Sequence, residues 1–179
     1  MPEIEIRPAT AADIPTLIQL DHTSLTTHVW QMERLHEDNS LQTTFREVRL
    51  PRPIRLNYTK PISQLASTWQ IMTLVLVAVH KDQLVGYITL TDQHLPHCLW
   101  ISDLVVADSL RRKGIGSAMV IASQDWAVRR QLKRVIMEMH SKNYPAIQFA
   151  QKLGFEFSGY NDHYYANQDI GLFFGKFLK

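Results

Sequence analysis

The segment 111–117, with the sequence Arg-Arg-Lys-Gly-Ile-Gly-Ser, combines residue types that together could bind a phosphate group. Glycine lets backbone N–H groups turn toward an anion without a Cβ atom in the way. A helix that begins at such a turn adds the partial positive charge of its N-terminus, and three cationic side chains stand beside it. We therefore expect this segment, called the glycine loop below, to hold a pyrophosphate such as that of adenine-nucleotide cofactors.

Two other phosphate-binding motifs do not fit the glycine loop. The dinucleotide fingerprint needs a third glycine three positions after the second, where this chain has Met119. The Walker loop needs Lys and then Ser or Thr directly after its last glycine, but Ser117 and Ala118 follow Gly116 here. A basic turn that only begins a helix is the alternative to a binding site. A strand before the loop and a helix after it favour the binding site.

The elements expected around the glycine loop form one supersecondary unit. Residues 98–106 are rich in β-branched and apolar side chains and are followed by a polar step, which predicts a strand. Residues 116–130 keep a mostly helical apolar rhythm, and residues 135–139 form a short apolar strand. This order predicts a parallel β-α-β crossover with the loop at the end of its first strand.

The rest of the chain is expected to add strands and helices around this unit. From residue 22 to residue 70 the pattern weakens, and prolines at positions 51, 53 and 61 exclude a long helix there. That stretch is either a substrate-shaping arm or an ordinary surface segment. The other strands expected are 4–7, 71–80, 84–91, 155–160 and 170–177, and the other helices are 11–20, 30–38 and 145–153.

Length and composition indicate one globular domain over residues 1–179. A formal net charge of +2 does not single out nucleic acid as a partner. Cys98 is the only cysteine, so no intramolecular disulfide can form, which favours a reducing compartment or indifference to redox conditions. The acidic start at residues 1–5 differs from a secretory signal, and the apolar run 71–79 is far shorter than the ~20 residues that span a bilayer. We expect a cytoplasmic protein without membrane contact.

Two motifs together resemble the GNAT superfamily of N-acetyltransferases. The first is Val-x4-Arg-x-x-Gly-x-Gly, present as Val106, Arg111, Gly114 and Gly116. The second is an Asn followed by Ala and by Leu-Gly-Phe, present as Asn143, Ala146 and residues 153–155. The resemblance covers nearly the whole chain and implies an α/β (α+β) single-domain fold. Its central sheet would be mixed, mostly antiparallel, of about seven strands, and flanked by helices.

A finer resemblance is to the streptothricin acetyltransferases. It rests on Ile101-Ser102-Asp103, residues 114–118, Trp126-Ala127 and Tyr165-Ala166-Asn167. The superfamily implies transfer of an acetyl group from acetyl-CoA to a primary amine by direct attack on the thioester, without a metal or a covalent enzyme intermediate. The acceptor amine would belong to a small molecule, such as a streptothricin-like antibiotic, or to a protein.

The resemblance also implies which residues would bind the cofactor. Backbone N–H groups of the glycine loop would meet the pyrophosphate, the edge of residues 104–106 would meet pantetheine, and the N–H of Leu104 would stabilise the oxyanion. The cofactor-binding candidates are Leu104, Val105, Val106, Arg111, Arg112, Lys113, Gly114, Ile115, Gly116, Ser117, Asn143, Ala146 and Phe149.

Proton transfer needs further residues. A substrate amine with a pKa near ~10 must lose a proton, and Asp103 and Glu138 are carboxylates within apolar strands. The alternative for each carboxylate is that it makes a structural hydrogen bond or lies at a strand edge and faces water. Ala150 stands where many family members have a Tyr that protonates the leaving thiolate. Tyr160 is our named catalytic candidate for that role, with Tyr144, Tyr164, Tyr165 or solvent as alternatives.

Other functions compete with catalysis. His94, His97 and Cys98 lack the second cluster that would complete a metal site. Ala150 motivates a non-catalytic acetyl-CoA-binding module. A nucleic-acid-associated protein would use the basic residues at 129–134, although such runs are usually solvated helix ends, together with Arg46, Arg49, Arg52 and Arg55. The hydrophobic final strand makes a homodimer conceivable.

Overall fold

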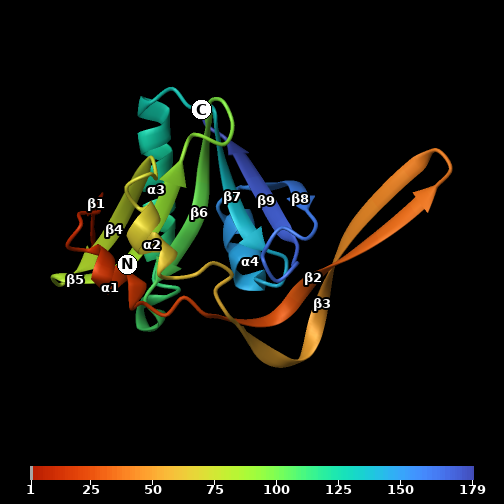
Figure 1. Ribbon diagram of the computed structural model, residues 1–179, viewed down its shortest axis with the longest axis horizontal. Coiled ribbons are helices and arrows are strands. Elements are labelled where there is room, and N and C mark those ends of the chain that lie inside the picture. The colour runs from red at the N-terminus through yellow and green to blue at the C-terminus, as the bar shows by residue number, and fades with distance from the viewer. Residues whose placement is uncertain (1) are drawn as a thin grey trace.

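The computed structural model describes residues 2–179, and a seven-stranded mixed sheet forms its centre (Figure 1). The strand order is β1-β4-β5-β6-β7-β9-β8, and within residues 2–179 only β6 and β7 pair in parallel. The strands of this sheet are β1 (Glu5–Pro8), β4 (Leu74–His80), β5 (Gln83–Thr91), β6 (Cys98–Val106), β7 (Arg134–His140), β8 (Glu156–Asn161) and β9 (Gly171–Phe177). The helices are α1 (Ile14–Ile18), α2 (Gln64–Thr68), α3 (Ile115–Arg129) and α4 (Tyr144–Lys152), with a short 3₁₀ turn at Asp108–Leu110.

Apolar side chains point to both faces of the central strands, so both faces of the sheet are buried. In β4, Val75 and Val77 pack with residues of α1 and α2, whereas Leu76 and Ala78 belong to the cluster that includes residues of α3 and α4. Successive side chains of a strand point to opposite faces, so helices on both sides are needed to cover such an apolar strand. The central strands are therefore held rigidly from both sides.

The β6–β7 pair opens partway along its length. Parallel pairing runs from Cys98–Arg134 to Ile101–Met137, and β6 continues to Val106 while β7 continues beside β9 to His140. The register of β6 with β5 also shifts between Ile101 and Asp103, so Ser102 forms a bulge. A bulge bends a strand and increases its twist, which separates β6 from β7 at this point. The separation creates room between two otherwise adjacent strands.

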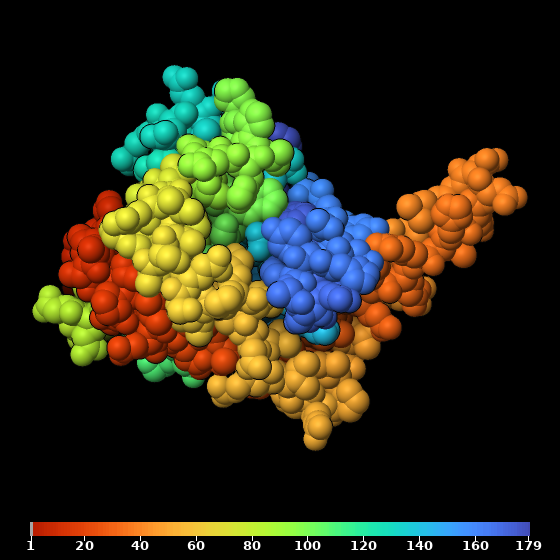
Figure 2. All heavy atoms as spheres, viewed as in Figure 1, coloured from red at the N-terminus to blue at the C-terminus, as the bar shows by residue number. Residues whose placement is uncertain are grey.

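Residues 22–70 differ most from the expectation. The helix expected at 30–38 is wrong, because these residues lie in β2 (Ser24–Glu37), which pairs with β3 (Ser40–Leu56) as an antiparallel hairpin. Its tip stands clear of the body of the protein (Figure 2). The base is anchored, since the Trp30 N–H donates to the Ser141 carbonyl at 2.9 Å. The ring centroids of Trp30 and Phe174 lie 5.7 Å apart.

The remaining architecture follows the expectation. The mixed, mostly antiparallel seven-stranded sheet and the parallel β6-α3-β7 crossover are confirmed. The short helix α2 was not expected from the sequence. No helix among residues 2–179 combines the length and apolar character needed to cross a membrane.

Candidate active site

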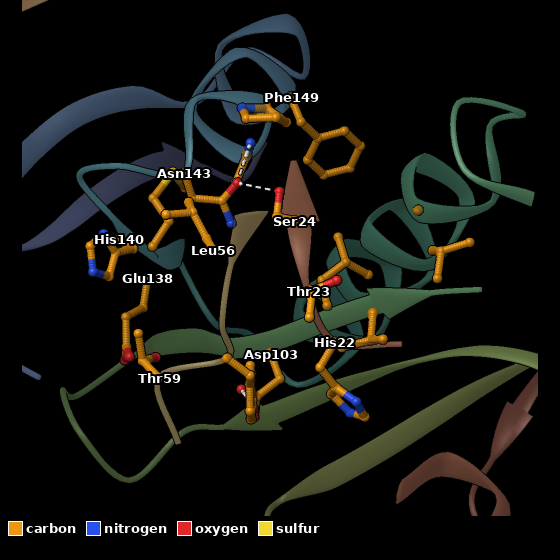
Figure 3. A pocket seen from close by; sticks show the side chains of 18 of the residues that line it. His22, Thr23, Ser24, Leu56, Thr59, Asp103, Glu138, His140, Asn143 and Phe149 are labelled. Carbon is orange, nitrogen blue, oxygen red and sulfur yellow. Dashed lines mark hydrogen bonds between the residues drawn. The ribbon is translucent and has the colours of Figure 1, made fainter. Parts of the chain in front are cut away.

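A cleft of about 1060 Å³ opens where β6 and β7 separate. It is bounded by the second half of β6, the end of β7, the glycine loop and the start of α4, and the segments 21–24 and 54–60 close its other sides. Figure 3 shows Asp103 from β6, Glu138 from β7 and Asn143 from the start of α4 around this space. The cleft is large enough for an extended cofactor together with a second molecule.

The glycine loop has a backbone shape suited to an anion. Arg112 has a φ of 63° and Gly114 a φ of 90°, so both adopt the left-handed conformation that turns neighbouring N–H groups to one side. The first N–H groups of α3, from Ile115 to Ser117, have no acceptor within the helix. Gly114 is the N-cap residue of α3, and within residues 2–179 no side-chain hydrogen bond caps this helix start. The loop therefore fits the pyrophosphate that the sequence led us to expect.

Arg111 is bonded to the backbone of two other segments. Its guanidinium donates to the carbonyls of Val106 at 2.9 Å, Thr23 at 2.9 Å and Asp21 at 2.6 Å. It also lies 3.1 Å from an Asp108 carboxylate oxygen. These partners occupy the side chain, so Arg111 joins the segment before β2 to the end of β6. That Arg111 or Lys113 adds charge at the pyrophosphate stays a prediction.

The other cofactor candidates fall into two groups. Leu104, Val105, Val106, Arg112, Gly114, Gly116, Ser117, Asn143, Ala146 and Phe149 line the cleft. Lys113 points to solvent, and the Ile115 side chain is buried in the core, so the latter offers only its backbone N–H. A Cβ atom added at Gly116 would lie 3.5 Å from Phe149 and 3.7 Å from Leu104, within the cleft wall.

Asn143 is fixed as the N-terminal cap of α4. Its Oδ1 accepts from the Ala146 N–H at 3.3 Å and from the Ser24 hydroxyl at 3.2 Å, the latter drawn in Figure 3. Asn is a preferred cap because its side chain satisfies an otherwise unpaired N–H of the first helical turn. The cap places the start of α4 at the cleft and connects it to the base of the hairpin.

Asp103 and Glu138 are brought together by a lysine that the sequence did not single out. Lys60 Nζ lies 3.2 Å from Asp103 Oδ1 and 3.4 Å from Glu138 Oε1. The carboxylate side chains are only 10 % and 6 % exposed. Burial alone would lower the pKa of Lys60, but the charges of Asp103 and then Glu138 outweigh it and raise that pKa above its ordinary value. Two carboxylates and one ammonium therefore leave this cluster with a formal charge of −1.

Neutral donors complete the bonding of both carboxylates. Asp103 accepts from the Thr89 hydroxyl at 2.7 Å and from the Tyr58 hydroxyl. Glu138 accepts from Trp100 Nε1 and from the Tyr164 hydroxyl, each at 3.0 Å. A buried charge needs such partners to offset the loss of water. Burial, followed by the charge of Asp103, raises the pKa of Tyr58, so this hydroxyl remains a donor at neutral pH.

The tyrosine candidates lie in different places. The Tyr160 hydroxyl bonds the Thr43 hydroxyl at 2.9 Å, and its ring packs on Phe45 of the hairpin, outside the cleft. Tyr165 instead lines the cleft, where burial and then the Glu138 carboxylate raise its pKa. Ala150 has a fully buried side chain in the core.

Two histidines at the cleft were missed by the sequence reasoning. His22 Nδ1 donates to the Leu20 carbonyl at 2.6 Å, and its Nε2 accepts from the Tyr87 hydroxyl at 3.0 Å. His140 Nδ1 accepts from the Lys142 N–H at 3.0 Å, and its Nε2 lies 2.7 Å from Asp169 Oδ2. Burial lowers the pKa of both rings, so they are neutral near pH 7 and do not cancel the negative charge of the Asp103 cluster.

The histidines and the cysteine considered as metal ligands do not form a site. Cys98 is buried in β6, and burial raises the pKa of its thiol. Within residues 2–179, no three His, Cys, Asp or Glu side chains gather in a way that could hold a metal ion.

Comparison with solved structures supports the architecture over nearly the whole chain. A nourseothricin acetyltransferase is 20% identical with a TM-score of 0.82, covering 98% of this chain and 99% of that one. A proposed streptothricin acetyltransferase from Bacillus anthracis strain Ames, solved with acetyl coenzyme A, is 16% identical with a TM-score of 0.76 and covers 98% and 99%. The ribosomal-protein-S18-alanine N-acetyltransferase from Escherichia coli is 13% identical with a TM-score of 0.68 and covers 99% and 95%. Likenesses at these identities show the fold alone.

Family membership rests on a sequence model rather than on these likenesses. A search of curated protein sequences found no match. The model of the acetyltransferase (GNAT) family, however, matches residues 32–155, which include the cleft-lining part of β6, the glycine loop, β7 and α4. The chain therefore belongs to the GNAT family of acetyltransferases.

Proposed function

We propose that this protein transfers an acetyl group from acetyl-CoA to a primary amine that binds as an ammonium ion. The observation that carries the proposal is the pair of buried carboxylates, Asp103 and Glu138, at the point where β6 and β7 separate. Family membership supplies the reaction class, and the charge of this cluster selects the acceptor class.

The glycine loop and the start of α3 are the proposed binding site for the cofactor's pyrophosphate. The left-handed residues Arg112 and Gly114 and the unpaired N–H groups of α3 supply a positive cradle. Beyond Ile101, the edge of β6 that turns away from β7 leaves backbone groups available for the pantetheine arm. The bound cofactor would contribute a thioester carbonyl that an amine can attack.

The acceptor would be drawn to the cluster by its charge. With Lys60 in place the three groups carry a formal charge of −1, and the neighbouring histidines are neutral. A cationic amine would balance that charge in a site partly shielded from water, where electrostatic attraction is stronger than in bulk solvent. Before attack the ammonium must lose a proton, and Asp103 or Glu138 is the proposed acceptor of that proton.

The remaining steps need little from side chains. We propose the Leu104 N–H as the donor that stabilises the negative oxygen formed during attack, because a backbone donor fixed in a buried strand needs no rearrangement. Tyr165 is the proposed tyrosine for the departing thiolate, as its hydroxyl stays protonated. A thiol with a pKa near the ~8.5 of cysteine can also leave near neutral pH with solvent as the acid.

Two acceptor classes are open to this site. Two of the structural neighbours are named for nourseothricin and streptothricin, and one for a ribosomal protein. Buried carboxylates in a cleft suit an ammonium on a slender alkyl arm better than a peptide N-terminal ammonium, which is attached directly to a branched backbone carbon. We therefore propose a small cationic amine, and a streptothricin-like antibiotic is the first compound to test.

The experiment is a screen of acceptors that follows CoA release from acetyl-CoA. Streptothricin, simple alkylamines, lysine peptides and peptides with free N-termini form the panel. The proposal predicts release above the hydrolysis background with the cationic small amines. Turnover confined to peptide N-termini would contradict the acceptor class, and binding of acetyl-CoA without any turnover would indicate a non-catalytic module.

A further inference from the structure

Lys60 occupies an unusual position for a residue of a surface loop. It belongs to the segment 57–63, which joins the end of β3 to α2 and is part of neither sheet. Yet its ammonium reaches the two buried carboxylates and also donates to the Ser102 carbonyl at 3.1 Å. Ser102 is the bulged residue at which β6 leaves β7. The ammonium thus sits at the apex of the cleft.

Lys60 also stands between two cavities. A second cavity of about 190 Å³ lies beneath α2, lined by residues such as Leu65, Met72 and Tyr87. It shares Tyr58, Lys60, Ser102 and Asp103 with the large cleft. The cofactor cleft and the smaller cavity are therefore separated by the side chains of the 57–63 loop.

We propose that Lys60 is an internal stand-in for the acceptor, whose alkylammonium group binds between Asp103 and Glu138 when the 57–63 loop withdraws. The inference rests on the proposed amine acetyl transfer. Lys60 presents the same chemical group as a primary alkylamine acceptor, on an unbranched chain, at the carboxylates beside the thioester site. An acceptor must displace Lys60. Because this displacement costs binding energy, the site favours amines with a further cationic or polar group over simple monoamines.

Two features of the loop agree with displacement. Lys60 and Tyr58 are its polar contacts with the carboxylates, and both bond Asp103 Oδ1, so one acidic oxygen holds two side chains of the loop. The Lys60 side chain is also 31 % exposed, so part of its length contacts solvent although its ammonium is bonded to the carboxylates. An incoming ammonium can replace both interactions at the same oxygen and leave the carboxylates paired throughout.

The test replaces the lysine side chain with a free amine. Lys60→Ala removes Cγ, Cδ, Cε and Nζ, the atoms that n-propylammonium supplies. The variant should melt about 10 °C below the wild type, because it leaves buried carboxylates without their cation. Near-saturating n-propylammonium should then raise its melting temperature by about 5 °C, since a ligand that binds only the folded state stabilises it.

Lys60→Met is the matched control, because methionine removes the charge but keeps most of the volume that fills the subsite. Its melting temperature should not respond to n-propylammonium, and neither variant should respond to n-propanol. An equal response of Lys60→Ala and Lys60→Met to n-propylammonium would overturn the proposal. If Lys60→Ala does not fold, the pair Lys60→Ala/Glu138→Gln and Lys60→Met/Glu138→Gln, which lack one carboxylate, makes the same comparison.

A second readout separates an acceptor subsite from a mere cation site. With acetyl-CoA present, Lys60→Ala should form N-propylacetamide at least tenfold faster than the wild type or Lys60→Met. In that step the amine nitrogen bonds to the carbonyl carbon, the C–S bond breaks, CoA leaves as the protonated thiol, and a carboxylate takes the ammonium proton. Stabilisation by n-propylammonium without its acetylation, in a variant that binds acetyl-CoA, would overturn the proposal. Failure of the wild type to bind acetyl-CoA would instead refute the proposed function, and the melting experiment would still report on Lys60.

Discussion

Replacing Arg111 should damage the fold more than it damages cofactor affinity, although Arg111 is part of the family's phosphate-loop motif. Its guanidinium donates to three backbone carbonyls, those of Val106, Thr23 and Asp21. Arg112, the next residue, is exposed and borders the cleft with a left-handed backbone. The variants Arg111→Met and Arg112→Met therefore remove the same charge from neighbouring positions with different surroundings.

The size of the difference follows from those contacts. A hydrogen bond from a charged donor contributes about 1.5–3 kcal/mol, and the 30 % exposure of Arg111 reduces this to about 1 kcal/mol for each of its three carbonyls. We expect Arg111→Met to lose about 3 kcal/mol, which lowers the melting temperature of a chain of this length by about 10 °C. Arg112→Met should change stability by less than about 0.5 kcal/mol.

Circular dichroism melting and calorimetric titration with acetyl-CoA measure the two effects separately. At a temperature where both variants are folded, Arg112→Met should weaken acetyl-CoA about fivefold to tenfold, as expected for one partly exposed cation near a phosphate. Arg111→Met should reduce the affinity for acetyl-CoA less than Arg112→Met does. The reverse pattern, with an unchanged melting temperature and a large loss of affinity for Arg111→Met, would refute the structural role given to Arg111.

Three further variants test the cofactor site, the carboxylates and the acid stability of the fold. Gly116→Ala should fold with unchanged or higher stability, because its Cβ makes only ordinary contacts of 3.5 Å or more. Its affinity for acetyl-CoA should fall at least tenfold, and an unchanged affinity in calorimetry would place the cofactor elsewhere. Asp103→Asn should lower kcat/KM at least about 100-fold while acetyl-CoA still binds, and a steady-state assay with unchanged kcat/KM would remove it from catalysis. Asp13→Asn should lose less stability in acid than the wild type does. A hydrogen bond from Arg7 holds the pKa of Asp13 below its usual 3.8, so this stabilisation is present above that pH and disappears as pH falls through the lower folded value. If the melting temperatures of wild type and variant fall in parallel from pH 6 to pH 2, the prediction is wrong.

The part of the fold that the sequence revealed is the part governed by local patterns. The strand, glycine loop, helix and strand from Cys98 to His140 each have a clear apolar period, and the observed bounds differ from the expected ones by one residue for α3 and β7. For Arg111, motif spacing gave the position of the residue but not the partners of its side chain. Its carbonyl partners near residues 21–23 become neighbours only in the folded chain.

The hairpin was misread because its strands gain little from the core. Most side chains near its tip are exposed, so neither strand shows the strict alternation that marks one buried face. Asp38 and Asn39 form the turn, and this polar pair between two runs rich in Thr, Val and aromatic residues was the available signal. Weighing turn chemistry above the apparent helical spacing would have predicted β2 and β3.

Lys60 and Tyr58 could not have been chosen from the sequence. Both lie in an aperiodic loop before Pro61, where nothing in the spacing distinguishes them from other polar residues. Their importance comes from contacts with Asp103, more than forty residues away along the chain. The carboxylates themselves were predictable, since a charge within an apolar strand requires either a partner or a function. Their partner, Lys60, comes from a distant part of the chain and is known only from the folded structure.

The proposed reaction is amine-dependent acetyl transfer at the β6–β7 cleft. The most direct measurement is CoA thiol release from acetyl-CoA by the wild type and by Gly116→Glu, each with and without a cationic amine from the acceptor panel. We expect the wild type to release CoA only when the amine is present and to form an equal amount of acetylated amine. Gly116→Glu should lose both acetyl-CoA binding and CoA release. Wild-type protein that binds acetyl-CoA but acetylates no amine, or a Gly116→Glu variant that remains fully active, would contradict the proposed reaction.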